Sequence, residues 1–326
     1  MKDWRFHFTR AKGTLLALAI FVLMFAIYGS NHQAGFSANV INTAANKGVL
    51  LALVAMAQTF VVLTSGIDLS VGMVFVLANC LASAIVVGSP LMTALGVMGV
   101  LAAGLTCGAV NGIVVVYGRL QPIVTTIATG AIFFGIALRL RPVPGGDINS
   151  SLAETLTGQL AGGVPASLLA LLVLVIAVWM PFRNSLVGRD IYAIGSSEAA
   201  AFMSGVNIRR AKLVAYMLSG LLAATGGLFV TLFTYSGEAS AANGATYTLN
   251  SIAAVVLGGV SLYGGTGSAI GAIFGAFVLR TIGDLLFVFD LDPLWQPLFQ
   301  GVVLLAAVCL GSLRLFRIRN RLDLFG

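Results

Sequence analysis

The chain has 326 residues, of which 59% are hydrophobic and only 9% are charged, and its formal net charge is +7. Soluble proteins of this size carry about 25% charged residues, so the composition excludes a soluble protein and predicts an integral membrane protein. The 39 glycines fit this prediction, because small residues let helices approach closely in lipid. Nucleic-acid binding is not expected, because the basic residues gather in segments that flank apolar runs.

Apolar runs, taken in chain order, predict about ten membrane-spanning helices. A basic tail over residues 1–12 precedes the first run, which we interpret as a retained signal anchor because no convincing small-x-small cleavage site follows closely. The spans are expected at 13–28, at 48–67, twice within 69–118, at 123–138, at 167–180, at 213–237, twice within 239–279 and at 294–311. Gly-containing breaks between them predict broken or re-entrant segments.

The fold class expected is therefore an all-α membrane protein. Its parts would be the tail 1–12, a transmembrane domain 13–311 with a polar loop 182–212, and a basic tail 312–326. Of the 18 Lys and Arg residues, four lie in the first tail, five in the loop and four in the last tail. Ten spans place these three segments on one side, which the positive-inside rule makes cytoplasmic. The acidic residues then fall on the opposite side, namely Asp147, Glu154, Glu238, Asp290 and Asp292.

Within the polar loop, a short helix is predicted over a run of small residues. Ser196 is expected to cap it, Glu198 falls in the first turn where the helix dipole favours a carboxylate, and Gly205 is expected to end it. The residues assigned to this helix and its ends are Ser196, Glu198, Ala199, Ala200, Phe202 and Gly205. Two interpretations stay open: the helix enters a groove of a partner protein, or the segment rests on lipid headgroups.

Motifs for hydrolytic chemistry and metal binding are missing from the sequence. There is no G-x-x-x-x-G-K-[ST], no G-x-S-x-G and no H-E-x-x-H, so the chain is not expected to be an enzyme or to hold a cofactor. The two histidines lie in the first tail and the first outer loop, and the three cysteines lie in apolar runs, so no metal site is expected. We interpret the Gly-rich stretch 258–267 as a break between helices, because it has no Lys to reach a phosphate.

Asp68 lies in a Gly-flanked break between two apolar runs. An ionised carboxylate at membrane depth is costly unless it faces protein or water, so Asp68 either lines or gates a translocation path, or lies at the cytoplasmic interface or caps the next helix. Arg280 and Asp284 stand one helical turn apart and are expected to pair. The further residues proposed to line a path, chosen for polarity or aromatic character within spans, are Gln58, Phe75, Asn79 and Asn250.

Several stretches together resemble the membrane-spanning permease subunits of ribose-type sugar ABC importers. They are T-S-G-I-D-L-S-V-G (64–72), Q-P (121–122), A-I-G-S-S-E-A-A-A-F-M-S-G-V-N (193–207), L-S-G-L-L-A-A-T-G-G (218–227) and V-L-G-G-V-S-L-Y-G-G-T-G-S (256–268). They follow the family's order from about residue 49 to 311, and the combination is highly specific. Two positions depart from the family pattern: Ser197 stands where Asn is frequent, and Ile123 where Phe is common.

The resemblance implies the ABC importer permease fold in a bacterial inner membrane, with both termini cytoplasmic. It implies import of a monosaccharide-like solute, a second permease copy (a homodimer or a close paralogue), a periplasmic sugar-binding protein and a cytoplasmic ABC ATPase. The family's ATPase-coupling loop maps onto Glu198, Ala199, Ala200 and Gly205. The competing hypothesis is an ion-coupled secondary transporter or channel that uses Asp68 or Asp284, and uptake that follows an ion gradient without an ATPase would favour it.

Overall fold

The computed structural model describes residues 2–303, 305–306 and 309, and side chains from residue 12 onward. Regular structure in this part of the chain is helical, apart from two isolated β-bridges. The helices are α1 Lys2–Asn31, α2 Ala38–Val62, α3 Val71–Ile85, α4 Pro90–Val116, α5 Pro122–Leu140, α6 Ser150–Thr157, α7 Ala166–Leu174, a π-helical turn Val175–Trp179, α8 Met180–Asn184, α9 Leu186–Ser196, α10 Glu198–Met203, α11 Ile208–Thr234, α12 Ala241–Leu257, α13 Ala269–Val288 and a 3₁₀ turn Pro293–Trp295.

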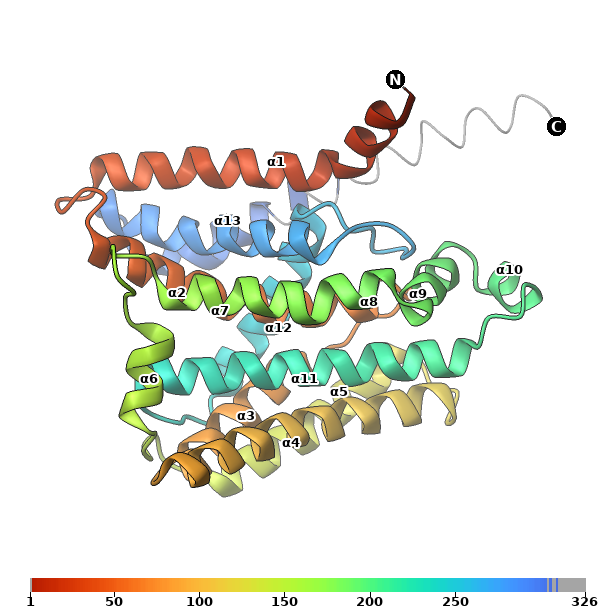
Figure 1. Cartoon of the computed structure of the whole chain (residues 1–326), viewed down its shortest axis with the longest axis horizontal. Coiled ribbons are helices and arrows are strands. Elements are labelled where there is room, and N and C mark those ends of the chain that lie inside the picture. Colours follow the sequence, from red (N-terminus) through yellow and green to blue (C-terminus); the bar gives the residue numbers. More distant parts are fainter. Residues whose placement is uncertain (1, 304, 307–308, 310–326) are drawn as a thin grey trace.

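Seven of the described helical segments are long and apolar enough to cross a membrane. They are Lys12–Asn31, Ala38–Val62, Pro90–Val116, Pro122–Leu140, Ala166–Asn184, Ile208–Thr234 and Ala269–Val288, and α3 is a shorter apolar helix. Many of them lie nearly parallel to the long axis of the molecule (Figure 1). The all-α, multi-pass prediction is therefore confirmed. Residues 296–303 are also helical, whereas the rest of the predicted span 294–311 and the tail 312–326 lie largely outside the described residues.

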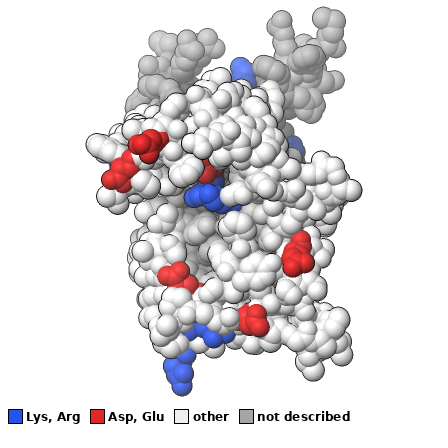
Figure 2. Space-filling view, turned by 90° about the vertical axis from the view of Figure 1, so that its left-hand side faces the viewer, with Lys and Arg blue, Asp and Glu red and all other residues white. Residues whose placement is uncertain are grey.

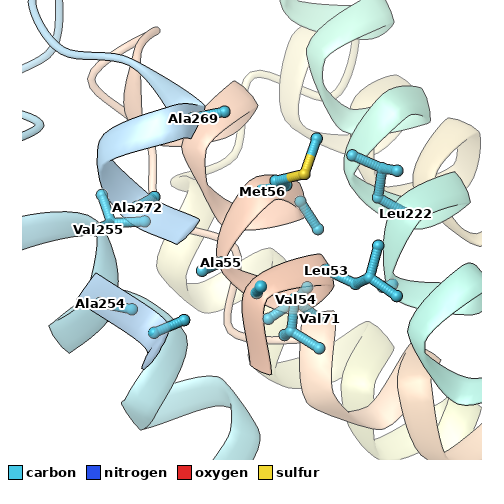
Figure 3. Close-up of a cluster of buried hydrophobic side chains, with 14 of the residues drawn as sticks. Leu53, Val54, Ala55, Met56, Val71, Leu222, Ala254, Val255, Ala269 and Ala272 are labelled. Atoms are coloured by element: carbon cyan, nitrogen blue, oxygen red, sulfur yellow. The ribbon is translucent and has the colours of Figure 1, made fainter. Parts of the chain in front are cut away.

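Helix α2 forms the centre of the bundle. Its membrane-spanning window is 94% buried, because α7, α11, α12 and α13 all pack around it. In Figure 3, Leu53 and Met56 lie on the side of α11, while Ala55 lies on the side of α12 and α13. A helix that is apolar on all sides belongs inside a larger assembly of helices, and the sequence of α2 has this character over residues 48–57.

The first turns of α2 differ from the prediction, which began the span at residue 48. The helix begins ten residues earlier, after Ser37, whose side chain accepts a hydrogen bond from the Val40 amide. The added turns carry polar residues that an apolar-run criterion leaves out. Asn42 and Asn46 both donate their side-chain amides to the carbonyl oxygen of Thr157, at 3.1 and 2.7 Å. The end of α6 thus accepts the side-chain donors of both asparagines of α2.

Helices α4 and α11 approach each other through glycine. A Cβ atom added to Gly220 would collide with the carbonyl oxygen of Gly104 and would lie 2.7 Å from the Gly108 nitrogen. A Cβ atom on Gly108 would in turn collide with the carbonyl oxygen of Tyr216. At this separation the backbones of the two helices are in direct contact, with no side chains packed between them, as expected for helices in lipid.

The molecule has two distinct ends. Helix α6 lies at one end and α10 at the other (Figure 1). At the α10 end, Arg209 lies 5.9 Å from the centre of the Tyr117 ring, which brings the 117–121 turn beside the start of α11. The α6 end, viewed in Figure 2, carries acidic side chains at several places. Lys and Arg side chains are also visible on this end, so the predicted separation of basic and acidic loops between the two sides of the membrane stays a prediction.

Candidate coupling and translocation site

Asp68 is enclosed in the break between α2 and α3. Its side chain is only 1% exposed, although it lies outside both helices. Oδ1 accepts hydrogen bonds from the Ser70 amide (2.9 Å) and the Ser70 hydroxyl (2.6 Å), and Oδ2 accepts from the Ser219 hydroxyl (3.2 Å). Three donors from the break and from α11 therefore compensate the buried carboxylate, which satisfies the condition for a charge at membrane depth.

A chain of buried polar side chains continues from Asp68 across the bundle. Asn111 of α4 donates its amide to the Ser70 hydroxyl at 2.7 Å, and Thr129 of α5 donates its hydroxyl to the Asn111 oxygen at 2.5 Å. The network thus joins α11, the break, α4 and α5 around one carboxylate. Sequence reasoning missed Ser219, Asn111 and Thr129, although an uncharged polar residue inside an apolar run is the available signal.

Gln58 joins the same site through the backbone of Asp68. With its amide oriented to match its neighbours, its nitrogen donates to the Asp68 carbonyl oxygen at 2.9 Å and its oxygen accepts from the Asp68 amide at 3.2 Å. Both side chains are almost fully buried within this chain. Two of the predicted path residues are therefore brought together, and they fix the backbone of the break rather than face an open channel in this structure.

The other predicted path residues lie in different surroundings. Phe75 is 3% exposed and its ring lies 4.3 Å from that of Tyr247. Asn79 donates to Thr231 at 2.9 Å and accepts from the Glu238 amide at 2.7 Å, so it orders the turn that follows α11. Asn250 lies half-buried on α12. Their participation in a path stays a prediction.

The predicted short helix of the polar loop is α10, but its cap differs by one residue. Ser197 is the N-cap, and its hydroxyl accepts from the Ala200 amide at 3.3 Å. Ser196 instead ends α9 and donates its hydroxyl to the Tyr192 carbonyl at 2.9 Å. An N-cap residue needs extended backbone, and Ser197 has it (φ −165°, ψ 108°), whereas Ser196 is still helical.

Helix α10 presents an exposed surface of small and apolar side chains. Ala199 and Ala200 are exposed, and Phe202 and Met203 are 71% and 87% exposed. Gly205 follows with φ +80°, so it ends the helix in the left-handed conformation as predicted. The helix is also attached to α11, because Glu198 Oε2 lies 2.7 Å from Lys212 Nζ. Whether it meets a partner or lipid stays a prediction at this point.

Beneath α10, three segments form a cluster that we call the clasp: residues 63–65, 192–196 and 263–267. Ser65 donates its hydroxyl to the Tyr263 carbonyl (2.7 Å), and the Gly265 amide donates to the Leu63 carbonyl (3.1 Å). Tyr192 of α9 donates its hydroxyl to the Gly267 carbonyl at 2.7 Å. The Gly-rich stretch is therefore a loop between α12 and α13, as predicted, and it links α9 to the end of α2.

Asp284 has a different partner from the one predicted. Its carboxylate lies 3.7 Å from Lys47 of α2, and the predicted pair with Arg280 is wrong. The spacing of one helical turn allowed that pair, but packing of α13 against α2 supplies a cation from another helix. Among the described residues, no three His, Cys, Asp or Glu side chains gather as metal ligands.

Comparison with known proteins agrees with this architecture. Residues 40–308 match the family described as the permease component of the branched-chain amino acid transport system. The ribose import permease protein of Escherichia coli K12 is 32% identical over 320 residues, which cover 94% of this chain and 97% of that protein. A probable ABC transporter permease of Sinorhizobium fredii is 36% identical over 297 residues (90% and 87%), and the fructose import permease protein of Rhizobium meliloti is 30% identical over 315 residues (94% and 87%).

No solved structure matches the chain. The family match and the alignments with the relatives each extend over most of the sequence, and two of these relatives are named as import permeases for a sugar, ribose or fructose. The predicted resemblance to sugar ABC importer permeases is thereby confirmed. The chain belongs to this family of multi-pass permease components of membrane import systems.

Proposed function

We propose that the chain is the membrane-spanning subunit of an ATP-driven importer that translocates a monosaccharide-like solute. The observation that carries the proposal is the exposed helix α10, which Glu198 attaches to Lys212 of α11. Seven residues further along α11, Ser219 binds Asp68 in the break. A push on α10 is therefore transmitted by one helix to the polar centre of the bundle. The ribose and fructose named for the relatives support a sugar as the solute.

The partners follow from what the chain contains. Because the sequence lacks a nucleotide-binding motif, a cytoplasmic ABC ATPase would supply the energy and would receive α10. A periplasmic binding protein would deliver the sugar at the α6 end. A second copy of the chain, or a close paralogue, would complete the path. In this orientation both termini and the loop 182–212 are cytoplasmic, as the positive-inside rule requires.

The clasp offers a second route from α10 to the break. Helix α9 ends directly before α10, and its Tyr192 binds the Gly-rich loop, which in turn binds Leu63 and Ser65. Ser65 has φ +64°, so the chain leaves α2 through a left-handed residue. Closure of the ATPase would move α9 and α10 together and would shift the break against the Gln58 and Asp68 contacts. This shift would change which side of the membrane the path faces.

An ion-coupled transporter or channel is less well supported. The hypothesis requires a carboxylate that can exchange an ion with the path. Asp284 is paired with Lys47, and both oxygens of Asp68 already accept hydrogen bonds from protein donors. Two of the relatives are named as import permeases, and a third is described as a probable ABC transporter permease.

The proposal predicts that Ala200→Glu abolishes coupling. Ala200 is exposed, so the variant chain should fold and reach the membrane normally. In a packed contact with the ATPase the new carboxylate would be buried without a partner, which costs about 3–5 kcal/mol. Since about 1.4 kcal/mol is a factor of ten, capture of the ATPase by the purified permease should fall at least a hundredfold. ATP hydrolysis stimulated by substrate in liposomes should be lost as well.

Two further variants make this test specific. Ala161→Glu introduces the same charge on an exposed loop at the α6 end, and it should leave ATPase capture unchanged. In Gly205→Val, the new side chain disfavours the left-handed backbone conformation that ends α10. An added Cβ at this position meets no neighbour within 4 Å, so the variant alters the end of the helix without a steric collision. Normal ATPase capture and normal stimulation by Ala200→Glu would contradict the coupling role and would favour a helix that rests on lipid.

A further inference from the structure

Arg280 lies near the middle of α13, about 16 Å from its first residue at a rise of ~1.5 Å per residue. Its side chain is half-buried, and its Nε atom is buried without a hydrogen-bond partner. A charged side chain at membrane depth is costly, and such residues are usually paired or face a water-filled cavity. The charge of Arg280 at this depth therefore requires a partner, and its own helix α13 does not provide one.

The neighbouring carboxylate does not neutralise Arg280. Asp284, one turn further along α13, forms its ion pair with Lys47. Lys47 and Arg280 thus supply two positive charges beside one negative charge. Within the part of the chain that the structure describes, Arg280 forms no ion pair and its Nε–H has no acceptor, which leaves this donor available to a bound molecule.

The packing of α13 on α12 shows what surrounds Arg280. Gly271 lies against Gly258, and Gly275 lies against Ala254, so the two helices run antiparallel. One more turn in this register places residue 279 against residue 250, which brings Arg280 to the level of Asn250. Tyr247 lies one turn before Asn250 on the same helix.

The face of α12 at this level has an unusual composition for a membrane helix. Asn243 and Thr246 are exposed and Asn250 is half-buried, on successive turns. Between them lies Tyr247, whose ring is held against Phe75 at 4.3 Å. In contrast, the exposed residues of α5 include Ile127, Ile132 and Ile136. Amides, a phenol, an aromatic ring and a guanidinium together offer the hydrogen-bonding groups and the flat apolar face that a polyhydroxylated solute requires.

We propose that Arg280 is a solute-contacting residue of the translocation path, where its guanidinium donates hydrogen bonds to oxygen atoms of the passing monosaccharide beside Asn250 and Tyr247. This inference rests on the proposed import function and adds a site to it. The planar guanidinium can donate two parallel hydrogen bonds to neighbouring oxygens, which a lysine ammonium cannot reproduce. The competing occupant is the phosphate of an anionic lipid, which offers the same acceptors but lies at the bilayer surface.

The first test is the access of water-soluble reagents to position 280. Arg280→Cys is made in a chain whose three native cysteines are replaced, and cells are treated with a negatively charged, membrane-impermeant thiol reagent. Leu169→Cys is the matched control, because Leu169 is exposed on α7, which packs against α2 and α6 rather than against α12. We expect position 280 to react and position 169 to stay unmodified. A position 280 that reacts no faster than position 169 overturns the proposal, because a lipid-facing side chain is shielded from the reagent.

The second test is the uptake of radiolabelled D-ribose and D-fructose, the sugars named for two of the relatives, and of D-allose as a third monosaccharide. Arg280→Gln should lower the maximal uptake rate at least tenfold at normal membrane levels, and Arg280→Lys should restore only part of it. The ratio of the rates for the three sugars should also change, which a loss of folded protein would not cause. Uptake by Arg280→Gln equal to that of the unmodified chain overturns the proposal.

The two tests separate this inference from the function on which it rests. If the unmodified chain shows no ATP-dependent uptake of any of the three sugars, the proposal that it imports these sugars is wrong. Reaction at position 280 still decides whether Arg280 faces a water-filled path. If uptake is normal and depends on ATP while Arg280→Gln has no effect, only the role of Arg280 fails. Release of a co-purified anionic lipid by Arg280→Gln, with uptake unchanged, assigns the residue to lipid instead.

Discussion

Asp68 stabilises the break between α2 and α3 through three hydrogen bonds to a single carboxylate. The Ser70 amide and hydroxyl bind one oxygen, and the Ser219 hydroxyl binds the other. Removal of the carboxylate would leave donors from two segments without partners in a place that water does not reach. The cost of an unsatisfied buried polar group exceeds the net value of the bond it once made.

At this scale we predict that Asp68→Ala destabilises the permease more than Asp68→Asn. Each buried donor left unsatisfied costs about 1–3 kcal/mol, so the alanine variant should lose at least that amount of unfolding free energy. Asparagine keeps one oxygen to accept from Ser70, and its amide can donate to the Ser219 hydroxyl. The measurement is the midpoint of thermal unfolding of the purified permease in mild detergent.

The control for this prediction is Glu154→Ala, which changes an exposed glutamate of α6. Surface substitutions usually alter stability by less than about 0.5 kcal/mol, so its midpoint should stay close to that of the unmodified chain. Equal midpoints for Asp68→Ala and Glu154→Ala would mean that the Asp68 carboxylate contributes nothing to the stability of the break.

Among the helices, the contact between α4 and α11 depends on the absence of side chains. Gly104, Gly108 and Gly220 lie where an added Cβ would meet the backbone of the facing helix. Backbone atoms cannot rotate away as a flexible side chain can, so the helices must separate to admit a methyl group. Helix α11 also carries Lys212 and Ser219, and its position therefore affects both the attachment of α10 and the polar centre.

At the scale of elements we predict that Gly108→Ala lowers the thermal midpoint. Overpacking of a tight contact costs about 1–3 kcal/mol, which exceeds the gain of up to about 1 kcal/mol that alanine brings to a helix. Gly135→Ala in α5 is the matched control, because its added Cβ has no neighbour within 4 Å, and it should leave the midpoint unchanged or raise it. A midpoint for Gly108→Ala at or above that of Gly135→Ala would contradict the close contact.

Across the whole molecule, the two ends carry different functions in the proposal. At the α10 end, Arg209 lies beside the turn at 117–121, and at the α6 end acidic side chains are visible together with some Lys and Arg side chains (Figure 2). The positive-inside rule assigns the first end to the cytoplasm. The ATPase and the binding protein can then act from opposite sides on one bundle.

At this scale we predict which residues are accessible from outside the cell. In a chain without its native cysteines, Ser150→Cys and Ala241→Cys should react with a membrane-impermeant thiol reagent, and Ser204→Cys should react only after the membrane is permeabilised. All three positions are exposed, so a difference in labelling reports the side of the membrane. Labelling of position 204 in intact cells would invert the orientation and would remove the ATPase contact at α10.

The amino-acid sequence by itself determined the class of this protein and the approximate number of its spans, because apolar length and charge asymmetry act locally along the chain. It also located α10 and its glycine end, since these depend on neighbouring residues. Tertiary structure decided the contacts between residues that lie far apart in the chain, which sequence patterns do not predict. Lys47 rather than Arg280 pairs with Asp284 because α2 packs on α13, and Ser219 reaches Asp68 because α11 crosses the break. Partners separated by more than a hundred residues meet only once the bundle is packed, so the polar centre and the unpaired Arg280 became visible only in the fold.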